Sequence, residues 1–145
     1  MAMKTRIALD SMVFIYHFER TEAYFHQVQE ILLSAQEGKS ELITSVISIA
    51  EVLSAPKYIH LPEIVKEINY FFMETEFLKI MGFDWDIASE TANLRRENKY
   101  LRMPDAIQLA TAVVSGAKLF VTNDKQLRKI KIFSAKIKVV GLEDF

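Results

Sequence analysis

Four acidic residues lie within or directly beside runs of apolar residues, where a carboxylate is least expected. They are Asp10, Glu51, Asp105 and Asp124. An ionised carboxylate is costly to bury without a compensating charge. Of the four, only Asp124 has a basic neighbour in the sequence, Lys125. If the fold brings the four acids together, a divalent metal ion is the simplest compensating charge.

Each acid also has to be weighed against a purely structural role. Asp105 follows Pro104 at the start of an apolar helical pattern, where the helix dipole alone favours an acid. Asp124 could serve only as the N-cap of a short following helix. Glu51 is different, because neither a cap nor a turn accounts for an acid in the middle of the apolar stretch 46–53. Glu51 is therefore the strongest single indication of a functional site.

Short apolar runs typical of buried strands alternate along the chain with amphipathic segments of helical period. The expected strands are 5–9, 42–45, 77–81, 118–122 and 136–140. The expected helices are 11–18, 21–36, a helix that carries Glu51 and ends before Pro56, 62–73, 84–98 and 104–116. Ser11, Thr21 and Asp84 are expected to cap three of these helices, because such side chains accept hydrogen bonds from free backbone amides.

Strands separated by helices imply parallel pairing through right-handed crossovers, with helices on both faces of the sheet. We therefore expect a single α/β domain over residues 1–145, with a parallel sheet of four to five strands. In such sheets, ligands bind outside the carboxyl ends of the strands. Asp10 and Asp124 follow two of the expected strands directly. Glu51 and Asp105 lie near the starts of helices that begin at the same edge, so all four acids can converge there.

Convergence of like charges indicates which chemistry the acids could perform. Two like charges about 4 Å apart repel by about 4 kcal/mol at an effective dielectric of about 20. The acids must then take up protons or bind cations. A set of oxygen ligands without His or Cys favours Mg²⁺ or Mn²⁺ over Zn²⁺. Such ions, held by carboxylates, usually serve phosphate chemistry.

The composition excludes several other classes of protein. The 145-residue chain is 50% hydrophobic and 26% charged, which is a globular rather than a disordered balance. It contains no Cys, so disulfides, thiolate zinc sites and Cys nucleophiles are excluded. The apolar run after the basic N-terminus is too short for a signal peptide or a membrane span. We therefore expect a cytoplasmic protein with no membrane association.

The net charge of −1 conceals a strong asymmetry along the chain. Residues 95–138 contain eleven Lys or Arg against three acids, a balance of +8, whereas the other residues have a balance of −9. This segregation is compatible with a face that binds a polyanion, and equally with a solvated lysine-rich surface.

The segments that carry the four acids resemble those of the PIN-domain ribonucleases, and most closely the VapC-type toxins of bacterial and archaeal toxin–antitoxin pairs. The matching segments are Asp10-Ser11 after the first strand, the strand and helix over 45–51, the helix start at 104–110 and the strand end at 121–124. The resemblance covers the whole chain in length, element order and acid positions. It implies a PIN-like three-layer α/β/α fold.

The resemblance also implies roles for individual residues. Asp10, Glu51, Asp105 and Asp124 would form an acidic quartet around Mg²⁺ or Mn²⁺. Ser11 and Thr122 match small hydroxyl residues that support the quartet. The family further implies cleavage of single-stranded RNA by a metal-activated water, frequent homodimers, and inhibition by a small protein antitoxin whose tail occupies the active-site groove.

Four basic residues flank the last two acids in sequence and are the expected contacts to RNA phosphates: Lys99, Arg102, Lys125 and Arg128. Phosphate contacts of this kind supply affinity without reading the base sequence. Several VapC-type proteins place a basic residue shortly before the third acid. Arg102 is the counterpart here, although the surrounding pattern departs from that of the family.

We therefore predict a metal-dependent endoribonuclease that is the toxin of a VapBC-type pair. One alternative is a catalytically inactive PIN-like module that binds RNA or acts as a scaffold. Another is a phosphatase or receiver domain, which also has an Asp after its first strand. Phosphatases of that kind usually show Asp-x-Asp, whereas this chain has Asp10-Ser11-Met12.

A dense aromatic cluster lies in and after the expected helix 62–73. It consists of Tyr70, Phe71, Phe72 and Phe77. These rings exceed what one helix face needs for core packing, so we expect part of the cluster to form a dimer or antitoxin contact.

Overall fold

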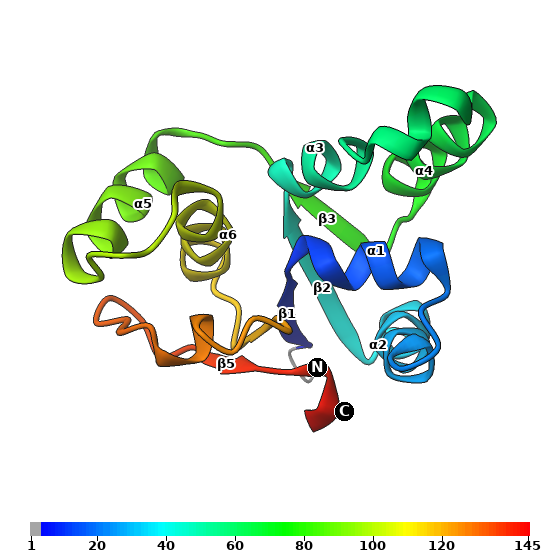
Figure 1. Ribbon diagram of the computed structural model, residues 1–145. Helices are drawn as coiled ribbons and strands as arrows, with labels where there is room; N and C mark the ends of the chain where they lie inside the picture. Colours follow the sequence, from blue (N-terminus) through cyan, green and yellow to red (C-terminus); the bar gives the residue numbers. More distant parts are fainter. Residues whose placement is uncertain (1–3) are drawn as a thin grey trace.

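A five-stranded parallel sheet forms the centre of the computed structural model, which describes residues 4–145 (Figure 1). The strands are β1 (Thr5–Leu9), β2 (Ser40–Ser45), β3 (Leu78–Met81), β4 (Leu119–Val121) and β5 (Lys138–Val140). The α-helices are α1 (Ser11–Glu19), α2 (Phe25–Gln36), α3 (Ile47–Leu53), α4 (Pro62–Glu74), α5 (Trp85–Glu97) and α6 (Met103–Val114). Short 3-10 helices are η1 (Pro56–His60), η2 (Leu127–Lys129) and η3 (Leu142–Asp144).

The strand order β3-β2-β1-β4-β5 makes β1 the central strand. Ala8 of β1 pairs with Ile43 on one side and with Phe120 on the other. The chain adds β2 and β3 on one side of β1, and then crosses back to add β4 and β5 on the other. The boundary between β1 and β4 is therefore the switch point at which open α/β sheets bind ligands.

The sheet separates two hydrophobic cores. Helices α1 to α4 cover one face and α5 and α6 cover the other (Figure 1). Successive residues of β1 point to opposite faces, so Ile7 and Leu9 enter the first core while Ala8 enters the second. The predicted three-layer α/β/α fold with a parallel sheet is confirmed. None of the helices described in residues 4–145 combines the length and apolar character needed to cross a membrane.

The helix starts agree with the sequence at one position and differ at two. Asp84 caps α5 as predicted, since its Oδ1 accepts the backbone N–H of Ile87 at 2.9 Å. The predicted cap at Ser11 is wrong, because Ser11 is already the first helical residue and its hydroxyl donates to Asp10. The predicted cap at Thr21 is also wrong. Its backbone carbonyl, not its side chain, accepts from the next turn, and α2 begins only at Phe25.

The aromatic cluster is divided between the core and the surface. Phe72 is buried, and both Phe71 and Phe72 pack edge-on against Phe14 of α1. Tyr70 and Met73 of the same helix remain 70% and 78% exposed. Apolar side chains on the outer side of α4 are therefore left in contact with solvent.

Candidate active site

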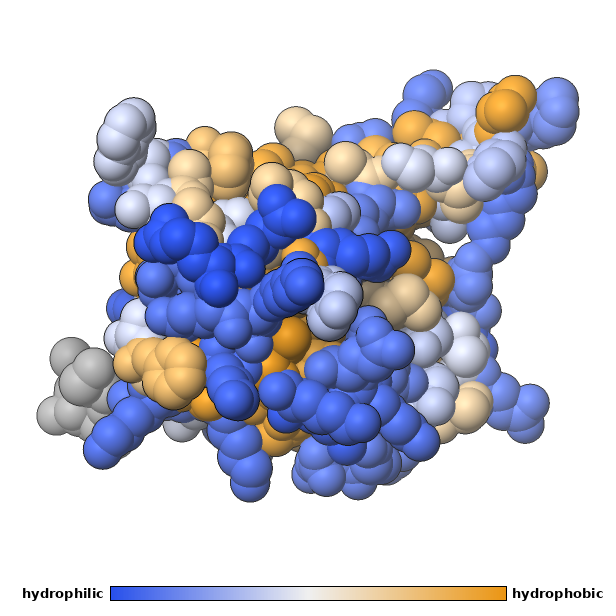
Figure 2. All heavy atoms as spheres, turned by 60° about the vertical axis from the view of Figure 1, so that its left-hand side comes forward, coloured by the Kyte–Doolittle hydropathy of each residue, from blue (hydrophilic) through white to orange (hydrophobic). Residues whose placement is uncertain are grey.

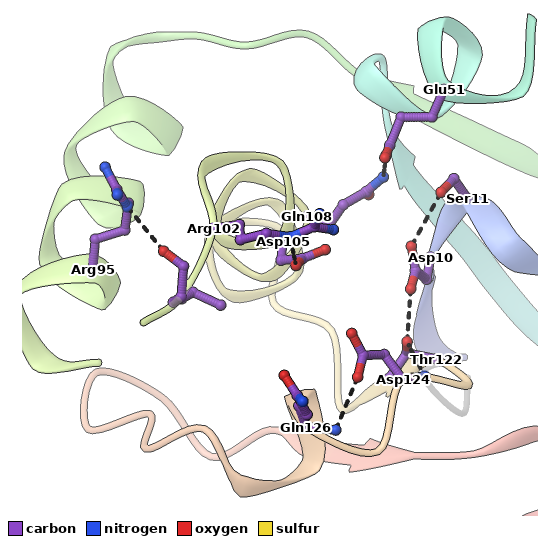
Figure 3. Close-up of polar contacts among 11 residues, drawn as sticks. Asp10, Ser11, Glu51, Arg95, Arg102, Asp105, Gln108, Thr122, Asp124 and Gln126 are labelled. Atoms are coloured by element: carbon purple, nitrogen blue, oxygen red, sulfur yellow. Dashed lines mark hydrogen bonds and ion pairs between the residues drawn. The ribbon is translucent and has the colours of Figure 1, made fainter. Parts of the chain in front are cut away.

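Asp10 is the most deeply buried of the four acids, with 7% of its surface exposed. Its backbone N–H donates to the carbonyl of Val121, which prolongs the pairing of β1 with β4 by one residue. The Thr122 hydroxyl donates to one carboxylate oxygen at 2.6 Å, and the Ser11 hydroxyl donates to the other at 3.3 Å (Figure 3). Both predicted supporting hydroxyls thus contact the same carboxylate.

Burial raises the pKa of the Asp10 carboxyl above its ordinary value. The hydrogen bond from Thr122 opposes this shift, while the negative charges of Glu51 and Asp105 add to it. The ionised form of Asp10 is therefore under electrostatic stress that a nearby cation would relieve.

Thr122 also connects Asp10 to Asp124. Its hydroxyl oxygen accepts the backbone N–H of Asp124 at 3.1 Å while its proton goes to Asp10. Asp124 in turn accepts the backbone N–H of Gln126 at 2.9 Å through Oδ1. The loop after β4 is thus fixed at both ends of Asp124, and its carboxylate is held beside the end of β1.

Glu51 is held from the opposite layer of the fold. Gln108 of α6 is only 2% exposed, and its amide nitrogen donates to Glu51 at 3.0 Å and to Ser48 at 2.9 Å. The Ser48 and Thr44 hydroxyls are 2.7 Å apart, and Thr44 donates to the carbonyl of Leu9 at 2.8 Å. A continuous chain of hydrogen bonds therefore links α6, α3, β2 and the end of β1.

Asp105 lies in the first turn of α6, where Pro104 fits because its missing N–H has no helical partner to lose. Its Oδ2 accepts from Nε of Arg102 at 3.2 Å. The Asp105 side chain is 17% exposed and that of Arg102 is 74% exposed. A solvated guanidinium thus stands directly beside a half-buried carboxylate.

All four acids line one pocket of about 340 Å³, which we call the acidic pocket. Its other lining residues are Ser11, Met12, Tyr16, Arg102 and Asn123. Four separate elements or loops supply the acids, so the parallel topology brings together residues up to 114 positions apart, from Asp10 to Asp124. The acids meet at the carboxyl edge of the sheet, where the sequence placed them.

The amino-acid sequence of the chain matches the model of a known protein family. Residues 7–132 match the family model of the PIN domain, which covers most of the chain. The chain belongs to the PIN-domain family. No curated protein matches it.

The PIN fold of the chain is also that of several solved structures. A VapBC2 structure from Rickettsia felis, bound to a DNA fragment of its promoter, has a TM-score of 0.73 at 16% identity, covering 94% of this chain and 98% of that one. A toxin–antitoxin complex from Klebsiella pneumoniae has a TM-score of 0.60 at 25% identity, covering 90% and 99%. VapC20 from Mycobacterium tuberculosis, described as a toxin that cleaves the sarcin–ricin loop, has a TM-score of 0.66 at 12% identity, covering 91% and 98%.

The ligand atoms that this PIN domain offers suit a hard cation. The oxygens that line the acidic pocket belong to carboxylates, hydroxyls and the Asn123 amide, and neither His nor Cys lines it. Mg²⁺ and Mn²⁺ prefer such ligands, and a bound cation would offset the burial of the Asp10 carboxylate, which is the main cause of its raised pKa. Within residues 4–145, no three acidic or His side chains stand close enough to hold an ion as they are oriented. Each acid accepts from a donor of its own, and the four carboxylates are held apart around the pocket.

The four predicted phosphate contacts of the PIN domain lie in different places. Arg102 lines the acidic pocket, and both Lys99 and Arg102 line a larger neighbouring cavity. Lys125 is exposed in the loop directly after Asp124. Arg128 lies on η2, forms an ion pair with Glu143, and lines neither of these two cavities.

Sequence reasoning missed two groups of residues at this PIN site. The first is the Gln108–Ser48–Thr44 chain, whose only indication in the sequence is a polar residue on the otherwise apolar side of a helix. The second is Tyr16, for which the sequence favoured core packing over a place in an RNA-stacking groove. It lines the acidic pocket, and its ring stacks on that of Tyr24 with 4.8 Å between the ring centres. Its hydroxyl oxygen accepts a hydrogen bond from the Asn123 side-chain amide at 3.2 Å.

Proposed function

We propose that this PIN domain is a metal-dependent endoribonuclease that hydrolyses single-stranded RNA and acts as the toxin of a VapBC-type toxin–antitoxin pair. The observation that carries the proposal is the acidic pocket, in which four carboxylates from four parts of the chain surround one space beside Arg102. The family match and the similarity to solved VapBC structures support the toxin assignment.

Mg²⁺ or Mn²⁺ bound in the acidic pocket would polarise a phosphoryl oxygen and lower the pKa of a coordinated water. Asp10 and Asp105 would hold the principal ion, and Asp124 would hold a second ion or its water. Glu51 would ligate the ion or orient the attacking water. If Asp105 held the ion, its contact with Arg102 would be weakened, and the Arg102 guanidinium would be available to pair with the RNA phosphate.

Thr122 and Gln108 act through the acids rather than on the substrate. Thr122 fixes the rotamers of Asp10 and of the loop that carries Asp124, because one hydroxyl bonds to both. The hydrogen bond from the Gln108 side-chain amide orients the Glu51 carboxylate at the pocket. Supporting hydrogen bonds of this kind orient metal ligands and set their basicity.

The proposal includes a cytoplasmic location, a small protein antitoxin and a homodimer. The exposed apolar side chains of η1 and α4 support a protein contact on that side, among them Ile59, Tyr70 and Met73. Sedimentation of the free protein over a range of concentrations tests the homodimer. A monomer at every concentration would contradict it.

Cleavage of a single-stranded RNA in Mn²⁺ is the direct test of the nuclease. We expect cleavage by the wild type, none in EDTA, and none by Asp10→Asn protein that retains the wild-type circular dichroism spectrum. Asp86→Asn is the matched control, since it removes an exposed aspartate of α5 outside both cavities.

Three outcomes would overturn the proposal. Full cleavage by the Asp10→Asn variant, with contaminating nuclease excluded, would contradict the mechanism. A wild type that binds RNA but never cleaves it would instead identify an inactive binding module. Turnover of a phosphomonoester with no action on RNA would favour the phosphatase class.

A further inference from the structure

A cavity with a volume of about 660 Å³ lies directly beside the acidic pocket. We call it the side cavity. Arg102, Asp105 and Asp124 line both spaces, so the two are continuous. Its volume lies within the range of roughly 300–1,000 Å³ that is typical of sites for small organic ligands.

The walls of the side cavity are fixed by hydrogen bonds. Asn98, at the end of α5, donates to the carbonyls of Leu94 and Lys131 and accepts the N–H of Lys131. Arg95 donates to the carbonyl of Leu101 at 3.1 Å, which holds the turn between α5 and α6 (Figure 3). The cavity is therefore preformed, and a ligand need not pay for ordering its walls.

The lining of the side cavity is apolar at its base and polar at its rim. Leu101 and Leu127 are 4% and 3% exposed and supply buried apolar surface. On the face that carries α5 and the segment after β4, hydrophilic side chains surround a smaller group of apolar ones (Figure 2). A flat ligand with an apolar face and polar edges matches such a lining.

Three side chains at the rim are available to a ligand. Tyr100 is 88% exposed, and the Lys99 ammonium lies 5.6 Å from the centre of its ring. Gln126 is exposed, and its backbone N–H, rather than its side-chain amide, makes the hydrogen bond to Asp124. Proteins bind unpaired nucleotides with groups of this kind. The rim offers the aromatic ring of Tyr100, the side-chain amide of Gln126, and the cationic groups of Lys99 and Arg102.

We infer that the side cavity is a nucleobase subsite, which holds the base next to the cleaved phosphate of a single-stranded RNA. Tyr100 stacks on the base, Gln126 hydrogen-bonds to its edge, and Arg102 and Lys99 contact the adjoining phosphates. The inference rests on the proposed nuclease function, because continuity with the acidic pocket sets which nucleotide occupies the cavity.

The two contacts with the base together make the subsite tolerant of sequence. Stacking on an aromatic ring tolerates any base, since every base has a π-face. The Gln126 amide offers one donor and one acceptor side by side, and the open edge of every unpaired base presents a neighbouring donor and acceptor that pair with such an amide. The subsite therefore accepts all four bases, with stacking from Tyr100 and a hydrogen bond from Gln126.

Binding of adenosine 5′-monophosphate to the full chain in metal-free buffer tests the subsite independently of cleavage. We expect saturable binding that ribose 5-phosphate, which lacks the base, does not show at the same concentrations. Tyr100→Ala should weaken binding by roughly 5- to 150-fold, the range that corresponds to loss of one stacked base. Tyr100→Phe should retain it. Trp85→Ala, which removes an equally exposed aromatic outside both cavities, should leave it unchanged.

Cleavage of short RNAs that differ only in the base beside the cut tests the contacts with the base. Tyr100→Ala should lower kcat/KM for all four bases, and Gln126→Leu should lower it for all four by a smaller factor, since one hydrogen bond contributes less than one stacked base. Wild-type cleavage with no effect of Tyr100→Ala on either assay would overturn the subsite and leave the nuclease intact. A Tyr100→Ala variant that loses only its affinity for a protein antitoxin would assign the cavity to that partner and overturn the inference.

Discussion

The surroundings of the buried Asp10 carboxyl have opposing effects on its pKa. Burial and the charges of Glu51 and Asp105 raise its pKa, while the hydrogen bond from Thr122 lowers it, and the net shift is upward. A protein that only needed a structural residue here could use Asn, which keeps the shape without the charge. The charged form thus costs stability at neutral pH, and the proposed cation would recover that cost.

Asp10→Asn is therefore expected to stabilise the metal-free protein. The unfolded carboxyl titrates near 3.8 and the folded one at higher pH, so the folded state binds more protons between these values. The wild type loses stability relative to the variant as pH rises through this window. At pH 7 the melting temperature of the variant should be higher, by roughly 2–4 °C for each 1 kcal/mol gained.

Melting curves between pH 4 and pH 8 measure this difference, which should widen with pH. Added Mn²⁺ should raise the melting temperature of the wild type but not that of the variant. Glu22→Gln, which neutralises an exposed acid in the turn after α1, should show neither effect. A lower melting temperature for Asp10→Asn across the whole range would show that the charge stabilises the fold.

At the level of elements, the alternation of strands and helices was predictable because it follows from local patterns of apolar residues. The strand expected at 118–122 is one residue shorter at each end, at Leu119–Val121, and the strand expected at 136–140 begins two residues later, at Lys138–Val140. The cap at Thr21 failed because a backbone carbonyl took over the role of the side chain.

The convergence of the four acids was predictable for a similar reason, since parallel strands present their carboxyl ends at one edge. The partners of the acids were not. Gln108 reaches Glu51 across 57 positions of sequence, and no local pattern encodes that approach. The side cavity likewise depends on how the turn before α6 faces the loop after β4.

The prediction at the level of elements concerns Gln108, whose side-chain hydrogen bonds join α6 to α3. Gln108→Met keeps a side chain of similar length but removes both hydrogen bonds, so Glu51 loses its support. The Mn²⁺ concentration for half-maximal cleavage should rise by about 10- to 100-fold, the usual effect of removing a group that orients a metal ligand. Stability should fall by about 1–3 kcal/mol because Ser48 loses a buried partner.

Gln29→Met is the matched control for this bridge. Gln29 also joins two helices through a side-chain hydrogen bond, at 3.0 Å to His17, and neither of these residues lines the acidic pocket. It should lower stability without changing the Mn²⁺ dependence. An unchanged Mn²⁺ dependence in Gln108→Met would show that Gln108 contributes to packing and does not orient Glu51.

On the scale of the whole molecule, charge is separated between two regions. Residues 95–138, with a balance of +8, include α6, β4 and the loops around both cavities, whereas α4 and its surroundings belong to the acidic remainder. An RNA chain entering the acidic pocket would otherwise meet four carboxylates. The flanking basic residues offset that repulsion and draw the backbone toward the side of α5 and α6.

The salt dependence of RNA binding tests this separation. Each phosphate neutralised on a single strand contributes about −0.7 to the slope of log K against log salt, so contacts by Lys99, Arg102 and Lys125 predict a slope of about −2. Anisotropy of a labelled single-stranded RNA with the Asp10→Asn protein measures it without cleavage. Lys125→Gln should reduce the slope by about 0.7. Arg128→Gln should reduce it less, because Glu143 already compensates that charge.

Lys66→Gln is the control for the opposite side of the molecule, since Lys66 is an exposed lysine of α4. It should leave the slope unchanged. A slope that depends on Lys66 but not on Lys125 would show that the RNA binds on the side of the molecule that carries α4. The acidic pocket would then lie away from the RNA path, and both the nuclease proposal and the nucleobase subsite would lose their geometric basis.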